Sequence, residues 1–276
     1  MPIEIPAGLA DYHDDRNPPP KKRQILVFLG LFFGTITLVI WGAVALANQA
    51  ITLIPPEVEQ QLGRVIVPTF EQMAEPGPAQ DQLNQLLDRL EREAPAEVTE
   101  GRDYQVLYVP QDVVNAIAIP GDRVIIYRGL LDQMGSENEL MMVLGHELGH
   151  FAHRDHLRGL GRGIVVRVAL AAVLGDVGTL GSIAIAGAEN LSNAQYSQGQ
   201  ETQADDFGLG LLVSHYGHAA GATDFFQRLG ESGGQGWDFL ASHPNPDRRV
   251  RQLNAWIEER GYDRLEKRSL PSELQP

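Results

Sequence analysis

A run of 23 uncharged residues near the N-terminus constrains the fold of this chain more than any other feature. The run extends from Ile25 to Ala47 and contains three phenylalanines and a tryptophan. A helix rises about 1.5 Å per residue, so this length covers a bilayer core of about 30 Å with a little tilt. A helix inside a globular protein is rarely apolar on every face. The run therefore predicts one transmembrane anchor at residues 25–47, which would place the chain in a lipid bilayer.

The charges on either side of this run predict its orientation. A basic triplet at residues 21–23 precedes it, and the first charges that follow are acidic, Glu57 and Glu59. Basic flanks remain on the cytoplasmic side of a membrane. We therefore expect a single-pass protein of the cell membrane, with residues 1–24 as a cytoplasmic tail. The catalytic part of the chain, after about residue 48, is expected on the extracytoplasmic, periplasmic side.

A cleaved signal peptide is the alternative to an anchor. The tripeptide Ala45-Leu46-Ala47 resembles a signal-peptidase site, and cleavage there would release the protein. However, the apolar run is longer than the roughly 7–15 residues of a secretory signal core. The length favours an uncleaved anchor, and the sequence leaves cleavage after Ala47 open.

Composition and charge exclude several classes of function. The 276 residues include 22 Lys and Arg against 36 Asp and Glu, for a net charge of −14. We expect no nucleic-acid partner, because a binding face would need positive charge to neutralise phosphates. The absence of cysteine excludes disulfides, iron–sulfur clusters, thiolate zinc sites and a cysteine nucleophile.

Residue periodicity predicts the organisation of the remaining chain. Residues 48–78 carry several prolines and are interpreted as a linker or packed lead-in, followed by a globular domain at 79–262 and a C-terminal tail at 263–276. Short β-branched runs predict strands, and apolar residues spaced by three and four predict helices. The expected strands are 104–109, 113–119 and 124–127, the last two forming a hairpin, and the expected helices are 79–93, 136–153, a polar helix ending near 215, 219–229 and 247–259.

One segment of this domain permits two interpretations. Residues 160–188 are glycine-rich and strongly apolar, but they also contain Arg162, Arg167 and Asp176. Charged side chains are expensive at membrane depth. The charges favour buried or membrane-surface helices over a re-entrant or spanning element.

The sequence His146-Glu147-Leu148-Gly149-His150 carries the strongest chemical signal. It lies in the expected helix that Ser136 would cap, with Glu139 three residues further on. Each helical residue turns about 100°, so the two histidines lie on one face, one turn apart, and can bind one ion. Glu147 can then reach a water molecule at that ion without binding the metal itself. This is the HExxH arrangement of a zinc peptidase, with one Zn²⁺ per chain and Glu147 as the general base.

A catalytic zinc ion needs a third protein ligand. His153 and His156 are too close in sequence to return easily to the same ion. Glu201 is the better candidate, because Glu201 and Asp205 share one face of the predicted polar helix. The Glu201 carboxylate can bind zinc, and Asp205 can accept the second ring N–H of a ligating histidine.

These motifs resemble a known family. HExxH followed by Glu-x-x-x-Asp is the gluzincin pattern, and the segments 115–121, 128–131 and 243–244 narrow the resemblance. Together they look like the membrane-associated zinc peptidases that include HtpX, the Ste-type CAAX prenyl proteases, BepA, LoiP and the mitochondrial Oma proteases. The resemblance covers about residues 57–262 and is nearest to the single-anchor periplasmic branch. The sequence departs from the family pattern at Gln198, because arginine is common at that position in the family.

The resemblance implies roles for three further residues. Asn115 would lie on the edge strand along which an extended substrate aligns. His243, in a loop, would either stabilise the oxyanion or act as a displaceable fourth zinc ligand. Arg249 matches the arginine that follows His-Pro in the family and would contact substrate.

The expected fold is therefore α+β and zincin-like. It has a small sheet, an HExxH helix, a second ligand helix and an N-terminal membrane helix. The implied activity is hydrolysis of internal peptide bonds in protein or peptide substrates, such as misfolded, membrane or envelope proteins, in protein quality control. A membrane-tethered chaperone or assembly factor with little proteolysis is the alternative, and a hydrolase of non-peptide substrates is a third.

Overall fold

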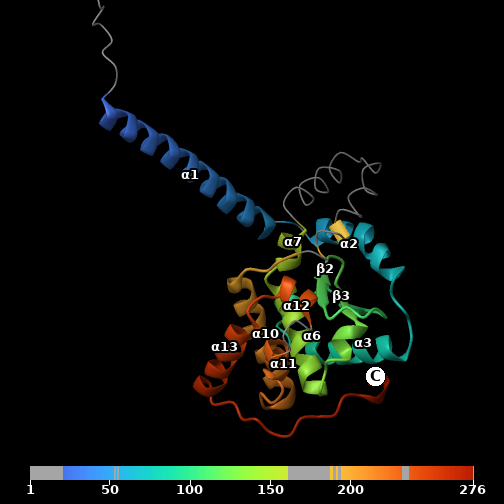
Figure 1. Ribbon diagram of the computed structural model, residues 1–276. Coiled ribbons are helices and arrows are strands. Elements are labelled where there is room, and N and C mark those ends of the chain that lie inside the picture. Colours follow the sequence, from blue (N-terminus) through green and yellow to red (C-terminus); the bar gives the residue numbers. More distant parts are fainter. Residues whose placement is uncertain are drawn as a thin grey trace, which may run out of the picture. The chain divides into compact units, whose positions relative to one another are not determined.

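The computed structural model describes residues 21–52, 54, 56–160, 187–188, 191, 194–231 and 236–275. The chain divides into two compact units, Met1–Gln49 and Ala50–Pro276. The long helix α1 (Lys22–Thr52) accounts for the described part of the first unit (Figure 1). Its segment Lys22–Gly42 is long and apolar enough to cross a bilayer, which makes α1 a candidate membrane anchor.

A three-stranded mixed sheet lies at the centre of the second unit. Strand β3 (Arg123–Tyr127) runs between β1 (Gln105–Val109), to which it is parallel, and β2 (Ala116–Ile119), to which it is antiparallel. The predicted hairpin of β2 and β3 is confirmed, although β2 begins three residues later than expected. Gly121 in the connecting turn has φ +89° and touches the backbone of Gly63, so a side chain at either glycine would clash.

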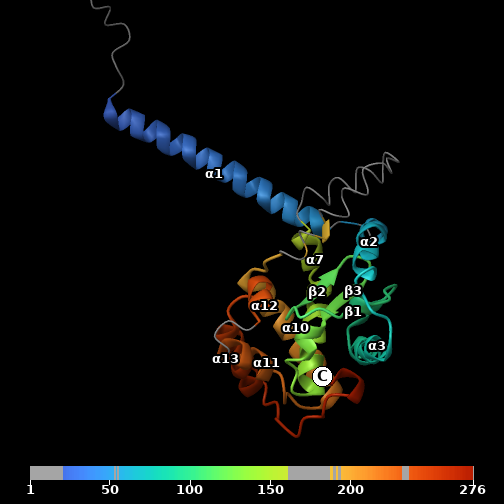
Figure 2. The same cartoon turned by 45° about the vertical axis from the view of Figure 1, so that its right-hand side comes forward.

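Each strand divides its side chains between two hydrophobic clusters. Alternate residues of the strands pack with Leu62, Ile66 and Phe70 of helix α2 (Pro56–Glu71) on one face. The other residues pack on the opposite face with helix α3 (Pro78–Glu91) and the HExxH helix α6 (Glu137–Ala152). The two faces of the sheet are therefore covered by different helices, α2 on one and α3 on the other, as Figure 2 shows.

Helix α6 begins and ends as its sequence indicates. The hydroxyl of Ser136 accepts a hydrogen bond from the backbone N–H of Glu139, which satisfies one N-terminal donor. The helix is followed by Arg154 in the left-handed conformation, at φ 58°. This turn sends the chain back beside the helix end and into the short helix α7 (Asp155–Gly159).

Helix α10 (Gln198–Tyr216) packs closely against α6 (Figure 1). A Cβ atom on Gly149 would lie 2.7 Å from the Cα of Ala204, and one on Gly208 would lie 2.8 Å from the backbone nitrogen of His146. Both separations are too short for a real side chain. The two glycines therefore allow the helix backbones to approach, which brings the start of α10 to the HExxH face.

The expected helix at 219–229 begins later than predicted. Gly217 and Gly221 both adopt positive φ, which ends α10 and keeps the following residues in turns. The remaining elements are α4 (Ala96–Thr99), α5 (Arg128–Leu131), α11 (Asp224–Glu231), α12 (Trp237–Ser242), α13 (Pro246–Glu259) and the 3₁₀ turn η1 (Ser272–Leu274).

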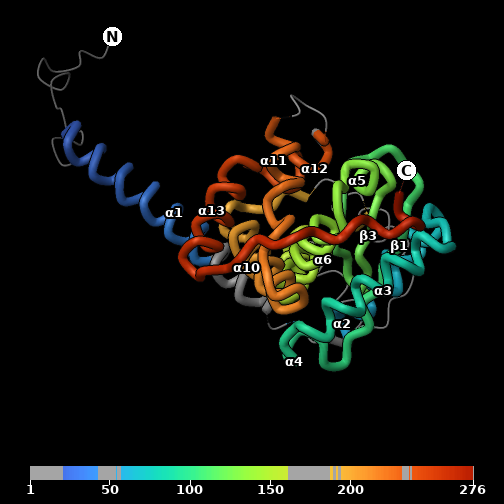
Figure 3. The backbone as a smooth tube through the Cα atoms, turned by 90° about the horizontal axis from the view of Figure 1, so that it is seen from below, coloured from blue at the N-terminus to red at the C-terminus, as the bar shows by residue number. Residues whose placement is uncertain are grey.

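Segments that the sequence analysis placed outside the domain pack onto it. Helix α2 lies within the segment interpreted as a linker or packed lead-in, and it supplies the core of one sheet face, as a packed lead-in would. After α13 the chain crosses α10 and α6 (Figure 3), and Leu270 and Leu274 are buried in the main cluster. The glycine-rich segment 160–188 lies almost entirely outside the described residues, so its two interpretations stay open.

Candidate active site

The two histidines of α6 converge on one point. His146 and His150 are both fully buried, and their Nε2 atoms lie 3.1 Å apart. Burial and the neighbouring charge of Arg249 lower the pKa of His146 well below its usual value. A neutral imidazole keeps a lone pair available, as metal binding requires.

Glu201 reaches the same point from the first turn of α10. One carboxylate oxygen lies 3.7 Å from His146 Nε2, and the other lies 3.7 Å from His150 Nε2. Tetrahedral zinc ligands at about 2.0–2.2 Å from the ion lie about 3.3–3.6 Å apart. Burial raises the pKa of Glu201, but the charges of His243 and Arg249 outweigh this effect and bring the pKa to about 2. The donor set of two imidazoles and one carboxylate therefore fits Zn²⁺.

Asp205 and Arg249 orient the His146 side of the site. An Asp205 oxygen lies 2.9 Å from His146 Nδ1, as expected for a carboxylate that sets the tautomer of a ligating histidine. Arg249 donates to both Asp205 oxygens, at 2.6 and 2.9 Å, and lies 3.0 Å from a Glu201 oxygen. Its guanidinium also stacks over Phe226. Arg249 is thus buried among the carboxylates behind the histidines, and its predicted contact with substrate stays a prediction.

A second carboxylate, which the sequence analysis did not identify, orients His150. Asp155 Oδ2 lies 3.2 Å from His150 Nδ1, and both side chains are fully buried. The ring of Tyr196 stacks on His150 with the centroids 3.9 Å apart. The only available signal for Asp155 was an acidic residue just past the helix end, and its function depends on the left-handed turn at Arg154.

The other two nearby histidines point elsewhere. His153 Nδ1 lies 2.8 Å from the backbone carbonyl of Gly149, and His156 Nε2 lies 2.8 Å from Glu59. Neither side chain is part of the group whose ligand atoms converge. Glu201 is not in that group either, but its two oxygens lie 3.7 Å from the Nε2 atoms of His146 and His150, which supports Glu201 over both as the third ligand.

Glu147 lies beside the two histidines. It is fully buried, neither carboxylate oxygen has a hydrogen-bond partner within the described residues, and burial raises its pKa to about 7. A metal cation at the histidines would favour the charged form and lower this pKa. A carboxylate without hydrogen bonds is available to accept a proton from a molecule that enters the site.

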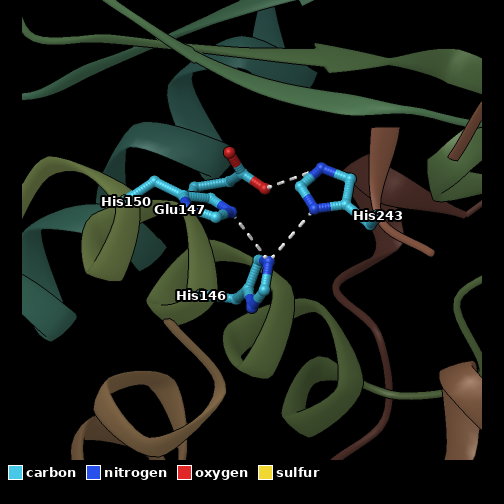
Figure 4. A group of neighbouring side chains, drawn as sticks. All are labelled: His146, Glu147, His150 and His243. Carbon is cyan, nitrogen blue, oxygen red and sulfur yellow. Dashed lines mark hydrogen bonds and ion pairs between the residues drawn. The ribbon is translucent and has the colours of Figure 1, made fainter. Parts of the chain in front are cut away.

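His243 completes the cluster from the loop after α12. Figure 4 shows its ring turned toward His146, His150 and Glu147. Its Nδ1 lies 3.1 Å from a Glu201 oxygen and 3.3 Å from His146 Nε2, and its Nε2 lies 3.9 Å from a Glu147 oxygen. The ring can therefore supply either a fourth donor to a metal or a hydrogen bond to a bound substrate.

A cleft of about 440 Å³ is lined in part by Ser242, the neighbour of His243 in the chain, whereas the candidate metal ligands are not among its lining residues. Asn115, Ile117 and Tyr127 from the sheet line one side, and Gln195 and Ser242 line another. Asn115 directly precedes β2, which is an edge strand of the sheet, and its expected alignment with a substrate stays a prediction. The Asn115 side-chain oxygen accepts from the backbone of Ala116 and from the Ser242 hydroxyl. The start of the edge strand thus borders this cleft.

Comparisons with known proteins agree with this geometry. Metalloprotease LoiP of Escherichia coli is 36% identical over 157 residues, which cover 55% of this chain and 61% of LoiP. Mitochondrial metalloendopeptidase OMA1 of Arabidopsis thaliana is 30% identical over 160 residues, 56% of this chain and 32% of that protein. The beta-barrel assembly-enhancing protease of Yersinia pestis is 30% identical over 160 residues, 51% of this chain and 32% of that protein.

The chain therefore spans about three fifths of LoiP and about a third of the other two relatives. The profile described as Peptidase family M48 matches residues 78–257, more than half of the chain. The matched region includes both histidines of α6, Glu147, Glu201, Asp205 and His243. The resemblance seen in the sequence is thus confirmed, and the protein belongs to peptidase family M48.

Proposed function

We propose that the protein is a membrane-anchored zinc metalloendopeptidase that hydrolyses internal peptide bonds. The observation that carries this proposal is the convergence of His146, His150 and Glu201 beside Glu147, whose carboxylate oxygens have no hydrogen-bond partner among the described residues. A purely structural metal site would have no use for a buried carboxylate without hydrogen bonds, which is destabilising.

Each residue of the site has a separate role in the proposed reaction. Zinc, when bound, is a Lewis acid that lowers the pKa of a water molecule and polarises a carbonyl group. Glu147 accepts the proton of the attacking water and later delivers it to the leaving amine. Asp205 and Asp155 each hold one histidine in a single tautomer and orientation.

The edge strand β2 supports a polypeptide substrate. Its outer edge carries backbone donors and acceptors that β3 does not use, so an extended chain can pair with it beside the cleft. One relative is called a beta-barrel assembly-enhancing protease. We infer that misfolded, membrane or envelope proteins are the substrates, with Asn115 at the binding edge.

Removal of the metal tests the activity. We expect the purified protein to cleave casein, a chelator to abolish cleavage, and added Zn²⁺ to restore it. Casein that is bound but not cut by the zinc-loaded protein would favour the tethered chaperone instead. Chelator-resistant cleavage would contradict the metallopeptidase mechanism.

We propose that the catalytic unit lies outside the cytoplasmic membrane. The basic triplet at 21–23 before the apolar run, with Glu57 and Glu59 after it, supports this topology. External protease added to spheroplasts should digest the domain, whereas detergent-free washing should leave it on the membrane. Protection of the domain would reverse the orientation, and its release into the soluble fraction would indicate cleavage after Ala47.

We expect His243 to restrain activity by occupying the coordination position that water or substrate would otherwise use. Its Nδ1 atom lies among the ligand atoms, and a histidine on a loop can leave a metal without unfolding a helix. His243→Ala should then raise basal peptidase activity, because a competitor for the open coordination position is gone. If His243 instead stabilises the oxyanion, the same change should lower kcat with little change in KM. Identical kinetics of variant and wild type at saturating zinc would exclude both roles.

A further inference from the structure

A second buried charge cluster lies next to the active site, around Glu59 of α2. The Glu59 side chain is fully buried. Its carboxylate accepts two hydrogen bonds from Arg102, at 2.7 and 2.9 Å, one from Arg154 at 3.0 Å, and lies 2.8 Å from His156 Nε2. Arg102 also donates to Asp122 at 2.6 Å, so two carboxylates share its charge, and Arg154 supplies the second positive charge of the cluster. The contacts to Arg154 and His156 also tie Glu59 to the segment that follows the HExxH helix.

These two residues flank the carboxylate that orients His150. Arg154, Asp155 and His156 are consecutive, and they follow directly on the HExxH helix. The outer two bind Glu59, whereas Asp155 in the middle lies 3.2 Å from His150 Nδ1. Glu59 thus holds both ends of the tripeptide whose centre contacts a metal-binding histidine.

The backbone of this tripeptide needs such support. Arg154 has φ 58°, a conformation that side-chain-bearing L-residues rarely adopt and that costs free energy. Besides Glu59, its guanidinium donates at 2.9 Å to the backbone carbonyl of Ile54, which is also outside the HExxH helix. Tertiary contacts with the segment that begins just after α1 therefore stabilise the turn that places Asp155.

We propose that Glu59 is a positioning residue of the metal site, acting through Arg154 and His156 to hold Asp155 on His150. This inference rests on the proposed zinc site. It links metal binding to α2, the first helix after the membrane anchor. A change that loosens the packing of α2 should therefore weaken zinc binding under conditions in which the domain is still folded.

Zinc affinity of the full-length protein in detergent, measured by competition with a chelator, tests the proposal. Glu59→Gln keeps the size of the side chain and removes its charge, so we expect about tenfold weaker zinc binding. Asp155→Asn should weaken it by about 10–100-fold, the range for residues that orient a ligand. The double variant should bind no more weakly than Asp155→Asn alone, because both changes act on one contact.

Glu139→Gln is the matched control. Glu139 is also a fully buried glutamate with cationic partners, Arg228 and Lys267, but it lies at the opposite end of α6. This variant should lose thermal stability yet keep its zinc affinity within about twofold. Wild-type zinc affinity in Glu59→Gln, an equal loss in Glu139→Gln, or additive effects in the double variant would each overturn the proposal.

A milder variant guards against a failure of Glu59→Gln to fold. His156→Phe removes one Glu59 contact and keeps a ring against Phe151, whose centroid lies 4.7 Å from that of His156. It should weaken zinc binding in the same direction, and unchanged affinity would count against Glu59. Wild type that binds zinc but cuts no casein would contradict the proposed function and leave this inference intact.

Discussion

Glu147→Gln should lower the rate of casein cleavage at least about a hundredfold, the lower range for removal of a general base. The amide has nearly the shape of the carboxylate but cannot accept the proton of the attacking water. Every candidate zinc ligand remains, so zinc content should equal that of the wild type. The measurements are the initial rate on casein and the metal content of the same preparation.

The stability of the same variant provides its control. Burial raises the pKa of Glu147 to about 7, so without metal the charged carboxylate disfavours the folded state as pH rises above 4.5, the ordinary value. Glutamine carries no charge at any pH. The metal-free variant should therefore unfold at the same temperature as the metal-free wild type or higher at neutral pH. Cleavage of casein at the wild-type rate would disprove the assigned mechanism.

Glu201→Ala should lose both zinc and activity, whereas Asp205→Ala should weaken zinc binding about 10–100-fold. Glu201 would be a direct ligand, and two imidazoles alone form an incomplete site. Asp205 acts one step away, through His146 Nδ1. Metal analysis after dialysis against zinc-free buffer distinguishes the two variants.

Circular dichroism should confirm that both variants are folded. Removal of Asp205 leaves the buried guanidinium of Arg249 with fewer acceptors, so this variant should also unfold at a lower temperature. Full zinc occupancy in Glu201→Ala would mean that another side chain is the third ligand. The structure would then favour His243, whose Nδ1 lies 3.3 Å from His146 Nε2, over His153, which contacts Gly149 instead.

The features that were readable in the sequence are those that depend on neighbouring residues. The spacing of His146 and His150 needs only the rotation of a helix to become a convergent pair. The helix cap made by the Ser136 hydroxyl and the hairpin turn at Gly121 likewise depend on neighbouring residues, and the structure contains both as expected. The uncharged run at 25–47 predicted a membrane-length helix from its composition and length alone.

Glu201 is an intermediate case. The sequence nominated it because Glu201 and Asp205 share a helix face, but periodicity cannot place one helix against another. The contact depends on Gly149 and Gly208, where the absence of side chains lets α10 approach α6. Only that approach brings the carboxylate to within 3.7 Å of both histidines.

The sequence nominated Asp205 as a residue that orients a ligand, but only the tertiary structure revealed the parts of Asp155 and Arg249. Asp155 reaches His150 because Arg154 adopts a left-handed turn, and that turn depends on contacts with Glu59, 95 positions earlier in the chain. Arg249 likewise binds Asp205 across 44 positions. A sequence pattern reports which residues lie on one face of one element. It does not show which charged residues, distant in the chain, become buried together. The packing of the helices against the sheet, which excludes water, decides those contacts.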